Sequence, residues 1–141
     1  MKVITVDVDN RIPFIEFIQQ NHDIEYIFLV YRRNREDNRL RLIYIGENKR
    51  EMGLESSDWR QHPRYQNWIK WAYNDENALV FSIVKVAEQE LKMAFDAMVL
   101  AFRPSVNSES GEVPSHIEEE VIVNFSGRNI CGRPFVRVGD Y

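Results

Sequence analysis

The stretch Leu42-Ile43-Tyr44-Ile45-Gly46 decides the fold, together with the apolar run Tyr26-Ile27-Phe28-Leu29-Val30-Tyr31 that precedes it. Both segments are rich in aromatic and β-branched residues, which favour β-strands. Polar turn residues separate the two segments, and Gly46 ends the second. The pattern therefore predicts an antiparallel hairpin with strands near 24–32 and 39–46.

Hydrophobic periodicity predicts the elements on either side of this hairpin. Residues 2–8 alternate with the period of a half-buried strand, and the run 78–86 has the composition of a central strand. Apolar residues at helical spacing predict three helices, at 12–20, 59–73 and 87–102. The expected fold class is α+β: a small central antiparallel sheet flanked by helices.

The composition shifts after Asn107, where Ser108 to Glu112 reads as a linker or loop. We interpret 1–107 as the main α/β domain and 108–141 as a C-terminal extension. Two short apolar segments in this extension predict a β-hairpin, or edge strands that pack on the same domain.

Length and composition set the class of protein. A chain of 141 residues forms one domain by size and buries enough surface to need no disulfide or metal staple. The single Cys131 excludes an internal disulfide, and one Cys with three His does not favour a structural zinc site. No apolar run has the length of a membrane span, and the alternating, Asp-bearing N-terminus does not resemble a signal peptide. We expect a cytoplasmic protein without a membrane partner.

The charge is unevenly distributed along the chain. A net charge of −4 argues against a dedicated nucleic-acid binder. Residues 31–64, however, hold nine Lys and Arg against six Asp and Glu, and five arginines fall within ten residues. One interpretation of this segment is a local basic face that binds a phosphate backbone. The other is a hairpin tip whose charges are simply solvated. The arginines that would bind nucleic acid are Arg32, Arg33, Arg35, Arg39, Arg41, Arg50 and Arg64.

The order of motifs resembles the GIY-YIG nuclease family, which has a hairpin with two tyrosines, a helix with Arg and His, and a helix with Glu and Asn. Tyr44-Ile45-Gly46 matches the second motif. Trp59 and His62 match the family's Arg-Trp-x-x-His spacing, and Arg103-Pro104-x-x-Asn107 matches its ending. The resemblance covers residues 24–107. It implies a GIY-YIG-like fold and Mg²⁺-dependent cleavage of a phosphodiester.

Three positions depart from the family's catalytic pattern. Phe28 stands at the first motif's Tyr, and a phenyl ring, unlike a phenol, cannot exchange a proton. Asp58 stands where the phosphate-stabilising Arg belongs. Phe95 lies twelve residues before Asn107, where many members carry the metal-binding Glu. Together these losses would remove most catalysis by the family's route.

The resemblance implies roles for the residues that remain. Tyr44 or His62 would handle the proton, Arg60 would stabilise charge, and Asn107 would fix the chain against the hairpin. The candidate metal ligand is Asp96, or Glu90 as an alternative. His62 also suits a packing or capping role before Pro63.

The segment 59–73 carries all three tryptophans of the chain, and such rings belong to the core or offer a docking surface. We therefore expect a degenerate GIY-YIG-like domain that binds DNA or RNA. The alternative is a protein-interaction or inhibitor module that uses the former active-site face or this Trp-rich helix. Both interpretations require the hairpin ending at Gly46 and the helix leading to Asn107 to share a pocket.

Overall fold

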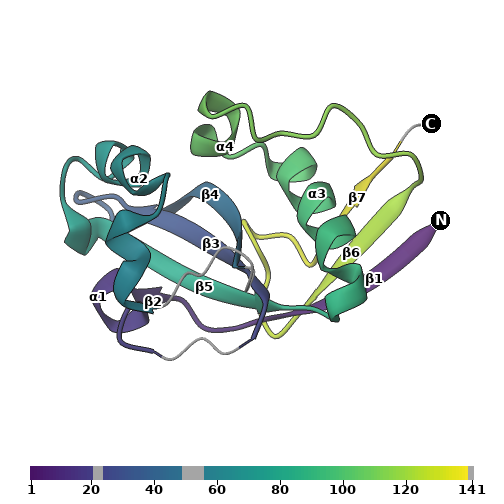
Figure 1. Ribbon diagram of the computed structural model, residues 1–141, viewed down its shortest axis with the longest axis horizontal. Coiled ribbons are helices and arrows are strands. Elements are labelled where there is room, and N and C mark those ends of the chain that lie inside the picture. The colour runs from purple at the N-terminus through teal and green to yellow at the C-terminus, as the bar shows by residue number, and fades with distance from the viewer. Residues whose placement is uncertain (21–23, 49–55, 140–141) are drawn as a thin grey trace.

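The computed structural model describes residues 1–20, 24–48 and 56–139, without side chains at 56–58. It combines one curled sheet with helices, in agreement with the expected α+β class (Figure 1). The strands are β1 (Lys2–Val8), β2 (Ile12–Pro13), β3 (Tyr26–Arg33), β4 (Leu40–Asn48), β5 (Leu79–Lys85), β6 (Val121–Ser126) and β7 (Phe135–Val138). The α-helices are α1 (Phe14–Phe17), α2 (Tyr65–Trp71), α3 (Leu91–Phe102) and α4 (Ser105–Glu109). Short 3₁₀ helices are η2 (Ser56–Gln61), η3 (Glu76–Ala78) and η4 (Glu88–Glu90).

The sheet has the strand order β4-β3-β5-β1-β6-β7, with β2 also paired to β5. The predicted hairpin is present as β3 and β4, and β5 pairs antiparallel with β3. The expectation of an antiparallel sheet is wrong at one junction, because β1 and β6 run parallel from Lys2↔Val121 to Asp7↔Ser126. Alternation in a sequence reveals a strand but not the direction of its partner, so this pairing left no local signal.

The segment after residue 107 adds strands to the same sheet. β6 and β7 form an antiparallel pair, and β6 lies next to β1 in the sheet. This pair corresponds to the predicted C-terminal strands. Figure 1 shows α3 lying across this end of the sheet. The pair therefore helps to cover the apolar face of α3.

The core has one layer on each face of the sheet. Tyr26 and Phe28 of β3 belong to the layer under α1 and α2, and Tyr31 belongs to the layer under α3. A register shift between Val30 and Tyr31 marks a β-bulge in the hairpin. Tyr44, on the edge strand, pairs with Val30 and faces the α2 layer with it.

Two predicted helices are shorter than expected. The segment 12–20 begins with β2, in which Ile12 pairs with Phe81, and only one turn of helix follows. The segment 59–73 is divided into η2 and α2, because Pro63 carries no N–H to continue a helix through this point. The third, 87–102, is present as η4 and α3.

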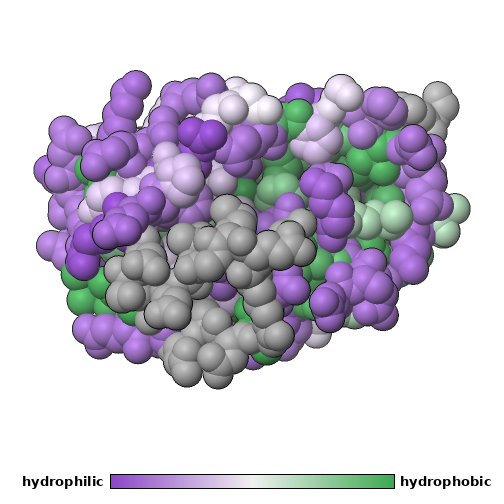
Figure 2. Space-filling view, viewed as in Figure 1, coloured by the Kyte–Doolittle hydropathy of each residue, from purple (hydrophilic) through white to green (hydrophobic). Residues whose placement is uncertain are grey.

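Polar side chains cover much of the surface seen in Figure 2, and hydrophobic groups show in patches between them. None of the helices in the described residues is long and apolar enough to cross a membrane.

Candidate functional site

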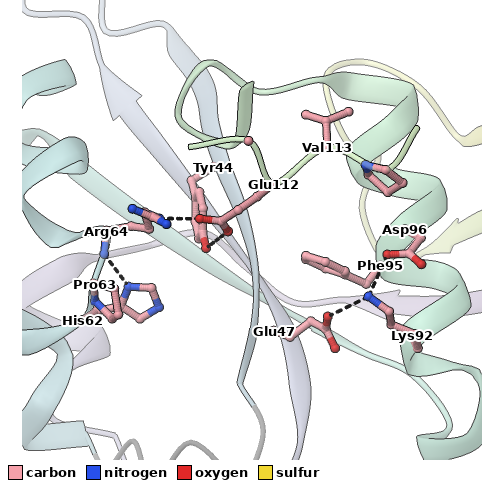
Figure 3. A pocket seen from close by; sticks show the side chains of 12 residues that line it. Tyr44, Glu47, His62, Pro63, Arg64, Lys92, Phe95, Asp96, Glu112 and Val113 are labelled. Carbon is pink, nitrogen blue, oxygen red and sulfur yellow. Dashed lines mark hydrogen bonds and ion pairs between the residues drawn. The ribbon is translucent and has the colours of Figure 1, made fainter. Parts of the chain in front are cut away.

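A cleft of about 570 Å³ opens beside the edge strand β4 (Figure 3). Its walls come from β4, the segment before α2, helix α3 and the loop after α4. Four of the predicted site residues line it: Tyr44, His62, Arg64 and Asp96. The hairpin and the last helical region therefore share a pocket, as the sequence predicts.

Asn107 joins α4 to the edge strand β4. Its Oδ1 accepts a hydrogen bond from the N–H of Ile45, and its Nδ2 donates one to the carbonyl of Ile45, both at 2.9 Å. Because β4 is an edge strand, these backbone groups have no neighbouring strand to pair with. The fully buried amide supplies both partners and covers the strand edge.

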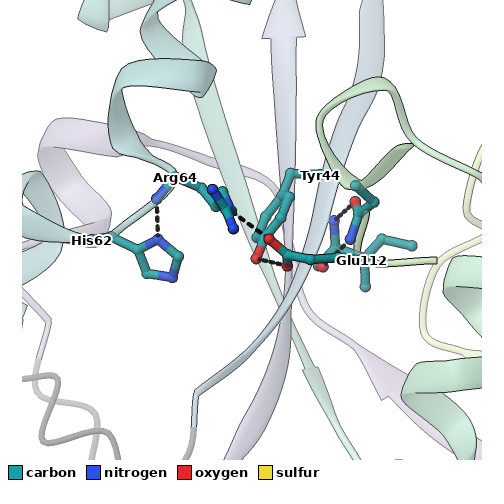
Figure 4. Close-up of polar contacts among 6 residues, drawn as sticks. Tyr44, His62, Arg64 and Glu112 are labelled. Carbon is teal, nitrogen blue, oxygen red and sulfur yellow. Dashed lines mark hydrogen bonds and ion pairs between the residues drawn. The ribbon is translucent and has the colours of Figure 1, made fainter. Parts of the chain in front are cut away.

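The cleft contains a carboxylate that the sequence did not single out. The hydroxyl of Tyr44 donates to Oε2 of Glu112 at 2.9 Å, and Nε of Arg64 donates to Oε1 of the same side chain (Figure 4). Burial of the phenol and the nearby carboxylate raise the pKa of Tyr44, so the group stays protonated as a donor. Glu112 lies in a polar loop, and only the contact itself distinguishes it from other loop acids.

His62 is neutral in the folded protein. Its ring is 6 % exposed and stacks against Trp59, with Trp68 at 4.7 Å between ring centroids. Burial, and then the charge of Arg64, lower the pKa of His62 to about 4. Its Nδ1 accepts a hydrogen bond from the N–H of Arg64 at 2.9 Å, so the proton of the neutral ring lies on Nε2. His62 thus combines the packing role with a hydrogen-bonding one.

This lowered pKa predicts an acid-dependent loss of stability. The unfolded chain binds a proton at His62 near pH 6.5 and the folded chain only near pH 4, so stability falls as the pH drops through this interval. We expect a loss of about 2 kcal/mol between about pH 7.5 and pH 5, measured by urea unfolding. His62→Gln should remove most of this slope. His116→Gln, at an exposed histidine, should leave it intact; equal slopes in all three proteins would contradict the assignment.

Arg60 does not reach the cleft, contrary to its expected role. Its guanidinium forms two hydrogen bonds with Glu76, each 2.7 Å long, and the hydroxyl of Tyr65 donates to the same carboxylate. The 3₁₀ turn before Pro63 directs residue 60 toward η3. Arg64, four residues later, lines the cleft instead.

The positions that depart from the family pattern have clear environments where they are described. Phe28 is fully buried in the core, and Phe95 forms part of the cleft wall. Asp96 binds the ammonium of Lys92 at 3.1 Å, and this ammonium also lies 3.9 Å from Glu47. The side chain of Asp58 lies outside the described residues.

The carboxylates that line the cleft have partners from the protein itself. Within the described part of the chain, no three His, Cys, Asp or Glu side chains come together as a metal site. Asp96 and Glu47 share Lys92, and Glu112 is held by Arg64 and Tyr44. In the folded protein these oxygens therefore have cationic or hydrogen-bonding partners.

The predicted arginine cluster divides between two faces of the sheet. Arg32 donates to the carbonyl of Trp71 at 3.2 Å, and the guanidinium of Arg41, its cross-strand neighbour, lies 5.2 Å from the Trp71 ring centroid. Arg35 forms an ion pair with Asp75 at 3.3 Å. Two others, Arg33 and Arg39, line a separate groove on the face that carries α3. Arg50 lies outside the described residues.

The tryptophans do not form the exposed surface that a Trp-rich docking helix requires. Trp59 and Trp68 are 1 % and 0 % exposed and belong to the core. Trp71 is half-buried, and its indole N–H donates to Glu109 at 3.1 Å.

The chain shows no match to protein-family models, to curated proteins or to solved structures. The cleft offers a donor phenol, a neutral imidazole and a paired guanidinium. Its lining carries two cations and three carboxylates, a formal charge of −1 with His62 neutral.

Proposed function

We propose that this chain is a GIY-YIG-like domain that binds nucleic acid and no longer cleaves it by the metal-assisted route of that family. One observation carries the proposal: Tyr44, His62 and Arg64 meet in a single cleft beside the hairpin. Asn107, from the region after α3, is bonded to the edge of the same hairpin. This combination follows the family's order of hairpin, histidine segment and terminal asparagine.

The cleft residues support binding without cleavage. Phe28 and Phe95 offer neither a proton nor a metal ligand at positions where the family has a phenol and a carboxylate. The charge of Arg64 is already compensated by Glu112. A phosphate entering between Arg64 and Tyr44 would have to displace that carboxylate and enter a lining of net negative charge. Transition-state stabilisation, which depends on preorganised and available charge, is consequently weak there.

Binding to nucleic acid would instead depend on exposed arginines, whose contacts with phosphates release counterions. Such binding is sequence-independent and falls steeply with salt. A protein with a net charge of −4 still binds in this way when its cations are gathered on one face.

The test is a binding and cleavage assay on the intact chain. Fluorescence anisotropy with a labelled DNA duplex should show binding that weakens at least about tenfold between about 50 and 200 mM salt. Incubation with Mg²⁺ should leave the duplex uncut.

If the duplex is cut, Tyr44→Phe tests the cleft, with Tyr73→Phe, at an exposed tyrosine, as the matched control. Cleavage abolished by Tyr44→Phe alone would show an active nuclease. Failure of the wild type to bind any nucleic acid at low salt would overturn the proposal and favour a protein-interaction module.

A further inference from the structure

A second hollow, of about 1020 Å³, lies on the sheet face opposite α2. It runs between the β3–β4 turn and the connection from β6 to β7. Four arginines from separate parts of the chain line it: Arg11, Arg33, Arg39 and Arg128. Among the described residues, its lining includes no Asp or Glu. We name these four residues and the hollow between them the arginine groove.

The arginines of the groove keep their charge available. All four are exposed. Arg11 lies 5.8 Å from the ring centroid of Tyr31, and Arg128 donates to Asn10 at 2.7 Å, so both have neutral partners. Arg39 lies 3.8 Å from the carboxylate of Asp37, and its own side chain is 87 % exposed. An ion pair this open to water is weak.

Several arginines outside the groove differ in this respect. Each of four holds a carboxylate at 3.3 Å or less: Arg35, Arg60, Arg64 and Arg137. The groove, by contrast, gathers four exposed guanidinium groups, and its described lining contains no carboxylate. This explains how a protein that is acidic overall, with an acidic cleft, still offers a site to a polyanion.

The loop that carries Arg128 is fixed by a glycine. Gly127 has φ +88°, in the left-handed region that favours glycine. A Cβ at this position would also lie 2.8 Å from the carbonyl oxygen of Val8. The close approach to β1 holds Arg128 opposite the arginines of the hairpin.

The aromatic rings at the floor of the groove indicate whether the groove suits the bases or the phosphates of a nucleic acid. Tyr31 and Phe125 form this floor, but they are only 4 % and 8 % exposed. Sites for single strands add exposed aromatic rings on which bases stack, and these rings are covered. Guanidinium groups without exposed aromatic rings bind phosphates well. Such contacts do not depend on the base sequence of the nucleic acid.

We propose that the arginine groove binds the phosphate backbone of a nucleic-acid duplex. The inference rests on the proposed function and places the contact on the face opposite α2 rather than in the cleft. Four phosphate contacts would give a slope of about −3.6 when log K is plotted against log salt, or about a 150-fold loss between about 50 and 200 mM.

The experiment compares two double variants with the same change in charge. Arg33→Gln with Arg128→Gln removes two cations from the groove. Lys70→Gln with Arg103→Gln removes two exposed cations elsewhere. Circular dichroism first establishes that both fold like the wild type. With a labelled DNA duplex, the groove variant should bind at least about tenfold more weakly at low salt, with the slope reduced by about 1.8, while the control keeps the wild-type slope.

The outcomes separate the two proposals. If the wild type binds the duplex and the groove variant binds equally well, the groove inference fails and the proposed function stands. If the wild type binds no nucleic acid, both fail. The same titrations with a labelled RNA duplex show whether the groove binds a DNA duplex or an RNA duplex more tightly. Tighter, groove-dependent binding of a single strand would overturn the assignment to a duplex.

Discussion

Replacing Asn107 by alanine is expected to lower the free energy of unfolding by about 3–5 kcal/mol. The change removes two hydrogen bonds and leaves the N–H and the carbonyl of Ile45 without their partner. Both groups are buried, and each then bears a desolvation cost of about 1–3 kcal/mol. Urea unfolding followed by circular dichroism measures the loss.

Ser108→Ala is the matched control. Ser108 is the next residue of α4, it is exposed, and its hydroxyl lies at 3.5 Å from its acceptor, the limit of a hydrogen bond. The control should change stability by less than about 0.5 kcal/mol. Asn107→Asp keeps an acceptor for the Ile45 N–H but sets a carboxylate against the Ile45 carbonyl, so it should also destabilise. A loss below about 1 kcal/mol for Asn107→Ala would contradict the role of the amide as the partner of the β4 edge.

Replacing Gly46 by alanine is expected to cost about 2–3 kcal/mol, although the residue lies in a regular strand. Gly46 pairs directly with Phe28 across the hairpin. A Cβ on Gly46 would overlap the end of the Phe28 ring and lie 2.7 Å from Cε2 of Tyr44. Both rings are packed on their other sides by Trp68, so neither has room to move.

A double-mutant cycle separates this clash from an intrinsic effect of alanine in a strand. Phe28→Leu shortens the opposing side chain, so Gly46→Ala should cost at least about 1 kcal/mol less in that background. Equal costs in both backgrounds would exclude the Phe28 ring as the cause. The glycine of the Tyr-Ile-Gly motif would thus be required by the aromatic side chain opposite it.

The sequence was sufficient where the signal is local. Strands β3, β4 and β5 follow from short apolar runs bounded by turn residues, and α3 follows from helical spacing. These elements depend on neighbours in sequence. The contact of Asn107 with the hairpin joins residues 62 positions apart, and only the resemblance to the GIY-YIG family implied it; the structure contains this contact.

The features that the sequence did not predict depend on contacts between residues far apart in the chain. Arg64 rather than Arg60 reaches the cleft because a 3₁₀ turn precedes Pro63, and a helical pattern does not reveal that turn. Glu112 acquires its role only when its loop folds over Tyr44. The arginine groove joins residues more than a hundred positions apart, such as Arg11 and Arg128, so no window of the sequence displays it.

The parallel pairing of β1 with β6 has a consequence for synthesis on the ribosome. Six residue pairs join β1 to β6, but only two join it to β5. The hairpin and β5 pair within a short span, so this part can form while the chain is still emerging. β1 completes its pairing only when residues 121–126, its main partner strand, have left the exit tunnel. Until then, one side of β1 exposes an unpaired backbone edge, and a nascent chain in this state is the form most in need of a chaperone.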